Sequence, residues 1–252
     1  MKKLVLALTA VVGLSTVTLA QNKVYKPVEG MSSLEVTFDP SSIFNANSSQ
    51  PTFSLPSIGG LNNGIKYRNW MSANVATRGT FLLGFRNISS PTVLFDSKGD
   101  KVDAQNKYFE WAIQLRPGIE RHFNGTNRLS PYVGSELIFG YGSNKYTQQD
   151  LDTTDAIVES TIKNGDKDFN GTPVSWTYVN GFSIGAGLVA GFDFYIAESL
   201  YLGLEMNYAF VYNKRAKVVT EIPGSDAVET KTGSNWFFDP SAGANLRLGW
   251  NF

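Results

Sequence analysis

Apolar residues alternate with polar or small residues along most of this chain, and the alternation is its strongest structural signal. In the segment SAGANLRLGWNF, which spans residues 241–252, the apolar residues share one parity, and serine, glycine, asparagine and arginine share the other. Successive side chains of a β-strand point to opposite faces, so this segment has one apolar face and one polar or small face. The pattern predicts a strand at the boundary between an apolar and a polar environment.

The same alternation recurs upstream, which gives eight candidate strands with the one above. The other seven are SSLEVTFD, GLNNGIKYRNW, VATRGTFLLGFR, YFEWAIQLRPGI, PYVGSELIFGY, FSIGAGLVAGFDFYI and LYLGLEMNYAFVYN. Most are long enough for the roughly 9–11 residues that a tilted membrane-spanning strand needs. Aromatic residues near the strand ends, with Tyr132 among those expected to face lipid, predict girdles at the two membrane interfaces.

Short and long connections take turns along the chain. Short turns are expected near residues 72, 127 and 198, and longer polar links at about 40–54, 88–106, 145–174 and 214–232. Short turns at one end and long loops at the other are typical of outer-membrane barrels, whose turns lie in the periplasm. The fold class predicted for residues 32–252 is therefore all-β, an eight-stranded antiparallel transmembrane up-and-down β-barrel.

The N-terminal residues predict export. A short basic start is followed by an apolar run from Leu4 to Leu14 and by the small-residue site Thr18-Leu19-Ala20. The run is too short to span a bilayer as a helix, so residues 1–20 are expected to be a cleaved signal peptide and residues 21–31 a periplasmic segment. With no cysteine and with 22 basic and 22 acidic residues, neither a disulfide framework nor nucleic-acid binding is expected.

Two stretches resemble a known group of proteins. The phrase GIKYRNWMSANVATRG has the form strand, short turn, strand, and the last strand carries alternating apolar residues, namely Leu246, Leu248, Trp250 and Phe252. Together with the strand pattern over residues 32–252, they resemble the small OmpA/OmpX-type barrel superfamily, particularly the stand-alone outer-membrane barrels of Bacteroidota. The resemblance implies a location in the bacterial outer membrane and recognition of the C-terminal residues by the barrel assembly machinery during biogenesis.

Charged residues collect on the parity that would face the barrel lumen. The acidic ones are Glu35, Glu110, Glu120, Glu136, Asp193, Glu205 and Asp239, and the basic ones are Lys66, Arg68, Arg78, Arg86, Arg116 and Arg247. Similar numbers of both signs favour pairing, because a buried unpaired charge is costly. The interior of an eight-stranded barrel is just wide enough for side chains to fill. A salt-bridged plug is the favoured interpretation, with a narrow or gated ion path as the alternative.

Candidate catalytic and metal chemistry is sparse. The single histidine, His122, is expected at the solvated periplasmic rim, and it has no evident nucleophile to serve. The segment 166–171, DKDFNG, matches the beginning of a calcium loop, but its twelfth position is Thr177 where that pattern requires glutamate. A polar turn-rich loop is favoured there, and no catalytic site, metal site or cofactor is predicted.

These observations favour a structural, anchoring or partner-binding protein, such as an accessory subunit of a larger outer-membrane complex. A narrow channel or conduit for ions or small hydrophobic molecules is the alternative, and a lipid-modifying enzyme is a third. The expected partners are outer-membrane lipid, the barrel assembly machinery and other outer-membrane proteins.

Overall fold

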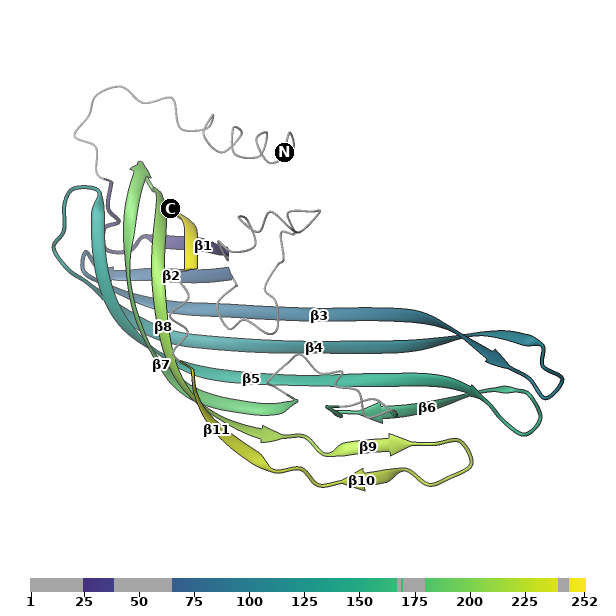
Figure 1. Ribbon diagram of the computed structural model, residues 1–252. Helices are drawn as coiled ribbons and strands as arrows, with labels where there is room; N and C mark the ends of the chain where they lie inside the picture. Colours follow the sequence, from purple (N-terminus) through teal and green to yellow (C-terminus); the bar gives the residue numbers. More distant parts are fainter. Residues whose placement is uncertain (1–24, 39–64, 167–168, 170–179, 240–244) are drawn as a thin grey trace, which may run out of the picture.

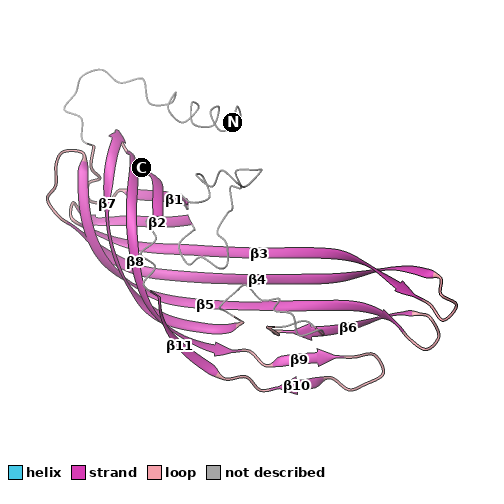
Figure 2. Ribbon diagram, in the orientation of Figure 1, coloured by secondary structure: helices cyan, strands magenta, loops and turns pink. Residues whose placement is uncertain are grey.

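The fold is all-β. The computed structural model describes residues 25–38, 65–166, 169, 180–239 and 245–252, and these residues contain strands, turns and loops but no α-helix (Figure 2). In the described part of the chain, no helix is long and apolar enough to cross a membrane. The strands are β1 Ser32–Phe38, β2 Ile65–Ser72, β3 Val75–Phe95, β4 Lys101–His122, β5 Leu129–Leu151, β6 Ile157–Lys163, β7 Gly181–Ala197, β8 Leu200–Arg215, β9 Val218–Glu221, β10 Val228–Thr230, β11 Ser234–Asp239 and β12 Asn245–Asn251.

Eight of these strands close into a ring. Going round it, β1 pairs with β2, β2 with β3, β3 with β4, β4 with β5, β5 with β7, β7 with β8, β8 with β12, and β12 with β1. Every pairing is antiparallel, and β11 also lies along β8. The predicted eight-stranded antiparallel barrel is therefore confirmed.

The strands turn their apolar side chains outward and their polar side chains inward. Along β7, Leu188 is 65% exposed and Phe182 is 44% exposed, whereas Asp193 is fully buried. A soluble barrel would bury the apolar parity and hydrate the polar one. The reverse arrangement places the apolar side chains against lipid.

Three of the four segments expected as long loops contain strands instead. β3 and β4 stay paired as far as Phe95 and Lys101, β6 continues beside the outer end of β5, and β9 and β10 form a further hairpin. The alternation persists in these segments, but polar residues occupy both faces because water lies on both sides, so the sequence looked like loop. Figure 1 shows the hairpins extending well beyond the barrel. The fourth segment, residues 40–54, lies outside the described residues.

The hairpin tips are joined to each other. Asp155, with a positive φ of 61° at the β5–β6 tip, accepts hydrogen bonds from the backbone N–H and the hydroxyl of Ser97 at the β3–β4 tip, at 2.9 and 2.6 Å. The β9–β10 hairpin joins the same sheet because β9 pairs with β6. The extension, which we define as the parts of β3–β6, β9 and β10 beyond the barrel, is thus one continuous sheet rather than a set of separate loops.

Candidate functional site

The barrel lumen holds a closed cycle of two arginines and two carboxylates. Arg68 on β2 lies 2.7 Å from Glu35 on β1 through Nε and 2.6 Å from Asp193 on β7 through Nη1. Arg247 on β12 lies 2.6 Å from Glu35 and 2.7 Å from Asp193 through its two terminal nitrogens. All four side chains are fully buried. The cycle therefore ties four strands of the ring together across the lumen.

A second group of charges continues from this cycle. Arg78 on β3 contacts Glu120 at 2.7 Å and both oxygens of Glu205 at 3.0 Å. Lys66 lies 2.7 Å from the same Glu205, and the hydroxyl of Tyr132 donates to it at 2.5 Å. Glu205 on β8 is consequently contacted by two cations and a hydroxyl within 3.0 Å, and Arg247 lies 3.7 Å from it, so its negative charge is compensated by neighbouring side chains.

Two further pairs follow. Arg116 lies 3.2 Å from Glu136, and its Nε–H donates to the side-chain oxygen Oε1 of Gln114 at 2.6 Å. Arg86, whose side chain is 35% exposed, lies 3.1 Å from Glu110. The larger exposure of Arg86 marks the change from the buried interior to the outer mouth.

The lumen charges balance. We define the lumen plug as the cations Lys66, Arg68, Arg78, Arg116 and Arg247 with the carboxylates Glu35, Glu120, Glu136, Asp193 and Glu205, all with side chains at most 5% exposed. Five positive charges face five negative charges, each within a salt-bridge distance of a partner. Because desolvation of each ion costs several kcal/mol, a buried set of this kind is tolerated only when each charge has a close partner of opposite sign. The geometry supplies such a partner for all ten side chains, while Arg68 Nη2, Arg78 Nε, Arg116 Nη2 and Arg247 Nε donate no hydrogen bond within the described residues.

Glycines make room for the largest lumen side chains. A Cβ on Gly203 would lie 2.4 Å from Nη2 of Arg247, and a Cβ on Gly249 would lie 2.2 Å from the Tyr201 ring. Both glycines have the inward parity, so the missing side chain is the space that the neighbouring residue occupies. The sequence places small residues where the filled lumen requires them.

Aromatic side chains close the periplasmic end of the lumen. Trp70, Tyr132, Tyr195 and Tyr201 are all at most 2% exposed. The expected lipid-facing position of Tyr132 is wrong, because it shares the inward parity of Glu136 on the same strand. The indole N–H of Trp70 donates to Ser33, whose hydroxyl donates to Asn251, at 2.8 and 2.6 Å.

The expected solvated position of His122 is also wrong, since this residue is 3% exposed. Its ring lies 4.5 Å from the Trp70 ring and 4.9 Å from the Tyr132 ring. Its nitrogens lie 2.9 Å from the hydroxyl of Ser130 and 3.4 Å from Glu120. The residue types match a serine–histidine–acid triad, but the serine is buried and the carboxylate already contacts two arginines, so a substrate carbonyl has no approach.

The remaining predicted residues lie elsewhere or outside the description. Trp250 and Phe252 are 57% and 56% exposed, with ring centroids 5.7 Å apart, on the outer side of β12 and just beyond it. Leu248 has the same outward parity and is half-buried. The side chains of Asp239 and Leu246 lie outside what the structure describes, as do residues 1–20 and most of the segment 166–177. Among the described residues, no cluster of histidine and acidic side chains could hold a metal ion.

Several solved structures align with most of the chain at low sequence identity and low TM-score. The N-terminal β-barrel domain of Pseudomonas aeruginosa OprF aligns with 12% identity over 90% of this chain and 100% of its own, with a TM-score of 0.32. Ail of Yersinia pestis aligns with 11% identity over 89% and 99%, at 0.32, and E. coli outer membrane protein W with 12% over 90% and 100%, at 0.31. No curated protein sequence matches the chain.

A family model does match the chain, over more than half of its length. The family is described as "Putative OmpA-OmpF-like porin family", and the match covers residues 100–252, from the β3–β4 tip to the C-terminal strand. The strands of the ring turn their apolar side chains outward, so this match shows the location of the protein as well as its family. The chain belongs to the OmpA-OmpF-like porin family and is a β-barrel protein of the bacterial outer membrane.

Proposed function

We propose that this protein is a sealed outer-membrane anchor that holds the extension outside the membrane as a surface for binding partners. The observation that carries this proposal is the lumen plug, whose ten side chains are at most 5% exposed and paired with one another. A path for ions needs hydrated space along the axis. Here the axis is crossed by salt bridges between strands on opposite sides of the ring.

The length of the strands supports the proposal that the extension stands outside the membrane. β3, β4 and β5 contain 21, 22 and 23 residues, about twice the 9–11 that crossing the membrane requires. On β4 the outward residues change from Phe109, Trp111 and Ile113 to Asp103, Gln105 and Lys107. That change marks the outer membrane boundary, so the extension stands in water.

The outer ends of the hairpins carry exposed apolar side chains. Phe95 at the β3–β4 tip is 63% exposed, Ile157 at the β5–β6 tip 46% and Val228 at the β9–β10 tip 62%. Covering these side chains with a partner would remove apolar surface from water, which is favourable. A protein partner at the cell surface, as in a larger outer-membrane complex, would provide that cover.

Two measurements test the two halves. Purified protein in planar lipid bilayers should give no conductance steps, and regular steps in most insertions would favour a narrow channel, the function that the family name suggests. A photo-crosslinking amino acid at Lys98, in the β3–β4 tip, should capture a protein in the native membrane. The same group at Thr77, which faces lipid on β3, is the matched control. Equal capture at both positions, or none at Lys98, would contradict the partner-binding role.

A further inference from the structure

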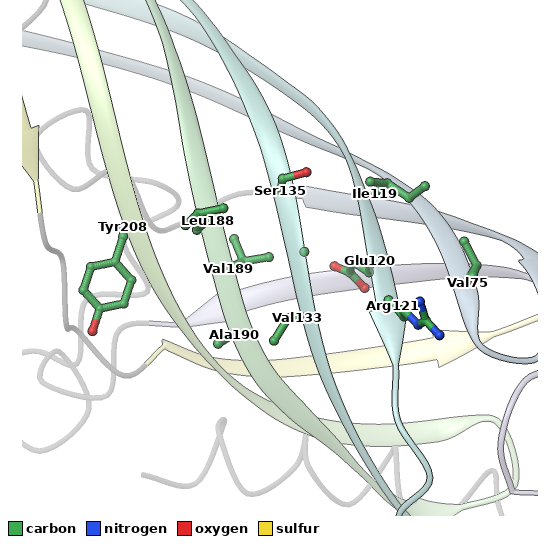
Figure 3. A pocket seen from close by; sticks show the side chains of 11 residues that line it. Val75, Ile119, Glu120, Arg121, Val133, Ser135, Leu188, Val189, Ala190 and Tyr208 are labelled. Atoms are coloured by element: carbon green, nitrogen blue, oxygen red, sulfur yellow. The ribbon is translucent and has the colours of Figure 1, made fainter.

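Two shallow hollows, of about 600 and 530 Å³, lie on the lipid-facing wall. Ile119 on β4, Ser135 on β5, Leu188 on β7 and Tyr208 on β8 line both, so the two hollows form one continuous groove, which we call the wall groove. Figure 3 shows the first hollow, with its lining residues distributed across neighbouring strands. The groove lies on the outer face of the barrel wall, and two residues of the lumen plug, Glu120 and Glu136, contribute to its floor.

Small outward side chains create the wall groove. Ser135 is paired with Ile119 on one side and Leu188 on the other, and it is the short member of that row. Ala186 and Ala190 flank Leu188 along β7. The outward side chains on both sides of Leu188, which is 65% exposed, are therefore short. Neighbours of ordinary size, such as Val133 and Leu137, form the edges. The depth of the groove is therefore encoded in three positions.

An arginine lies at one end of the wall groove. Arg121 is paired with Val75 and Val133, one residue before the end of β4, and its exposed side chain lines the first hollow. The short turns at this end of the barrel place it at the periplasmic interface. Within the described part of the chain, Arg121 has no ion pair or hydrogen bond through its guanidinium, and the other charged residues of the lining, Glu120 and Glu136, are buried in the plug.

We propose that the wall groove binds a glycerophospholipid of the periplasmic leaflet, with its phosphate on Arg121 and an acyl chain along Ile119, Ser135 and Leu188. The groove matches an amphiphilic ligand, because its cation lies at the water interface and its carbon-lined hollow runs from that cation toward the membrane interior. A guanidinium binds phosphate oxygens through two parallel N–H groups. The arginine supplies the charge complementarity that an apolar groove alone lacks.

The test is native mass spectrometry of the full chain folded in detergent and supplied with dioleoylphosphatidylglycerol or with dioleoylglycerol, which has the same acyl chains and no phosphate. The native protein should retain the phospholipid in preference to dioleoylglycerol. Arg121→Gln should lower its retention by about tenfold, since one charge-assisted contact is lost. Ser135→Leu, which fills the groove, should lower it as well.

Matched controls separate the site from general effects. Arg128→Gln removes a charge at the same periplasmic end outside the groove. Leu34→Phe enlarges an outward side chain on β1, none of whose described residues lines either hollow. Both should retain the phospholipid as the native protein does, and a heat-dependent gel shift shows that each variant is folded. Equal retention of the two lipids, or equal loss in Arg128→Gln, would overturn the proposal. A dimer that Ser135→Leu dissociates would also overturn it, because a second copy would then be the occupant.

Discussion

Removing Arg247 should destabilise the barrel strongly, and the contacts of this residue allow the loss to be estimated. Arg247→Ala deletes the ion pairs to Glu35 at 2.6 Å and to Asp193 at 2.7 Å, in a region where all three side chains are fully buried. The plug would keep five carboxylates but only four cations. Breaking a buried pair by removing one partner typically costs about 3–5 kcal/mol. Because Arg68 still contacts both carboxylates, the lower value, about 3 kcal/mol, is expected.

A compensating change tests whether charge balance is the cause. In Arg247→Met/Glu35→Gln, a carboxylate is neutralised together with the arginine and the methionine fills part of the space. This double variant should therefore be more stable than Arg247→Ala, because replacing a buried ion pair by uncharged groups of similar volume is often close to neutral. Lys101→Ala, at an exposed position with no side-chain ion pair or hydrogen bond within the described residues, is the control and should change stability by less than about 0.5 kcal/mol.

Urea titration of the protein in detergent micelles, followed by tryptophan fluorescence and by the gel shift between folded and heated samples, gives the free energy of unfolding. A fall of the size above for Arg247→Ala, with recovery in the double variant, is the expected result. An Arg247→Ala barrel that unfolds within about 0.5 kcal/mol of the native protein would refute the reasoning, since surface-like effects are of that size. It would mean that water reaches the cycle and screens its charges.

Three further perturbations address single contacts. Gly203→Ala places a Cβ 2.4 Å from Arg247 Nη2 and 2.9 Å from Asp193 Oδ1. The thermal midpoint of unfolding in detergent should therefore fall, by the equivalent of about 1–3 kcal/mol. Gly79→Ala, where a Cβ meets no atom within 4 Å, should leave this midpoint unchanged. Asp155→Ala removes both hydrogen bonds to Ser97, so amide hydrogen exchange at the two hairpin tips should accelerate while the urea midpoint of the barrel stays the same. Hydrogen bonds from the Thr154 hydroxyl and from the amides of Ala156 and Thr154 hold the pKa of Asp152 below its ordinary value of 3.8. These bonds therefore stabilise the β5–β6 tip above pH 3.8 and are lost as the pH falls through the lowered pKa, and NMR titration should show a shift back toward 3.8 in Thr154→Val.

The barrel could be predicted from the sequence because one physical rule repeats along it. A strand with lipid on one side and a filled lumen on the other must keep its apolar residues on the lipid side, and FSIGAGLVAGFDFYI does so over nearly its whole length, with Val189 as an apolar exception on the inward parity. The rule also assigns Arg68, Asp193 and Arg247 to the lumen, where the structure has them. It fails where the surroundings change, as in the extension, because strands with water on both sides need no apolar parity. The outer halves of β3 and β4 therefore looked like loops.

Partners within the lumen and on the wall depend on a second quantity, the register between strands, which no single segment contains. Arg68 and Asp193 lie 125 positions apart in the chain and meet only because the ring closes with this particular stagger. The same is true of Ser135, Ala186 and Ala190. Each is an ordinary small residue within its own strand, and only the pairing of Ser135 with Leu188 sets them side by side as a groove with Arg121 at its end. A one-residue slip of β7 against β5 would turn Leu188 into the lumen and bring the Asp193 carboxylate to the lipid. The buried salt bridges of the lumen plug therefore also fix the shape of the outer wall.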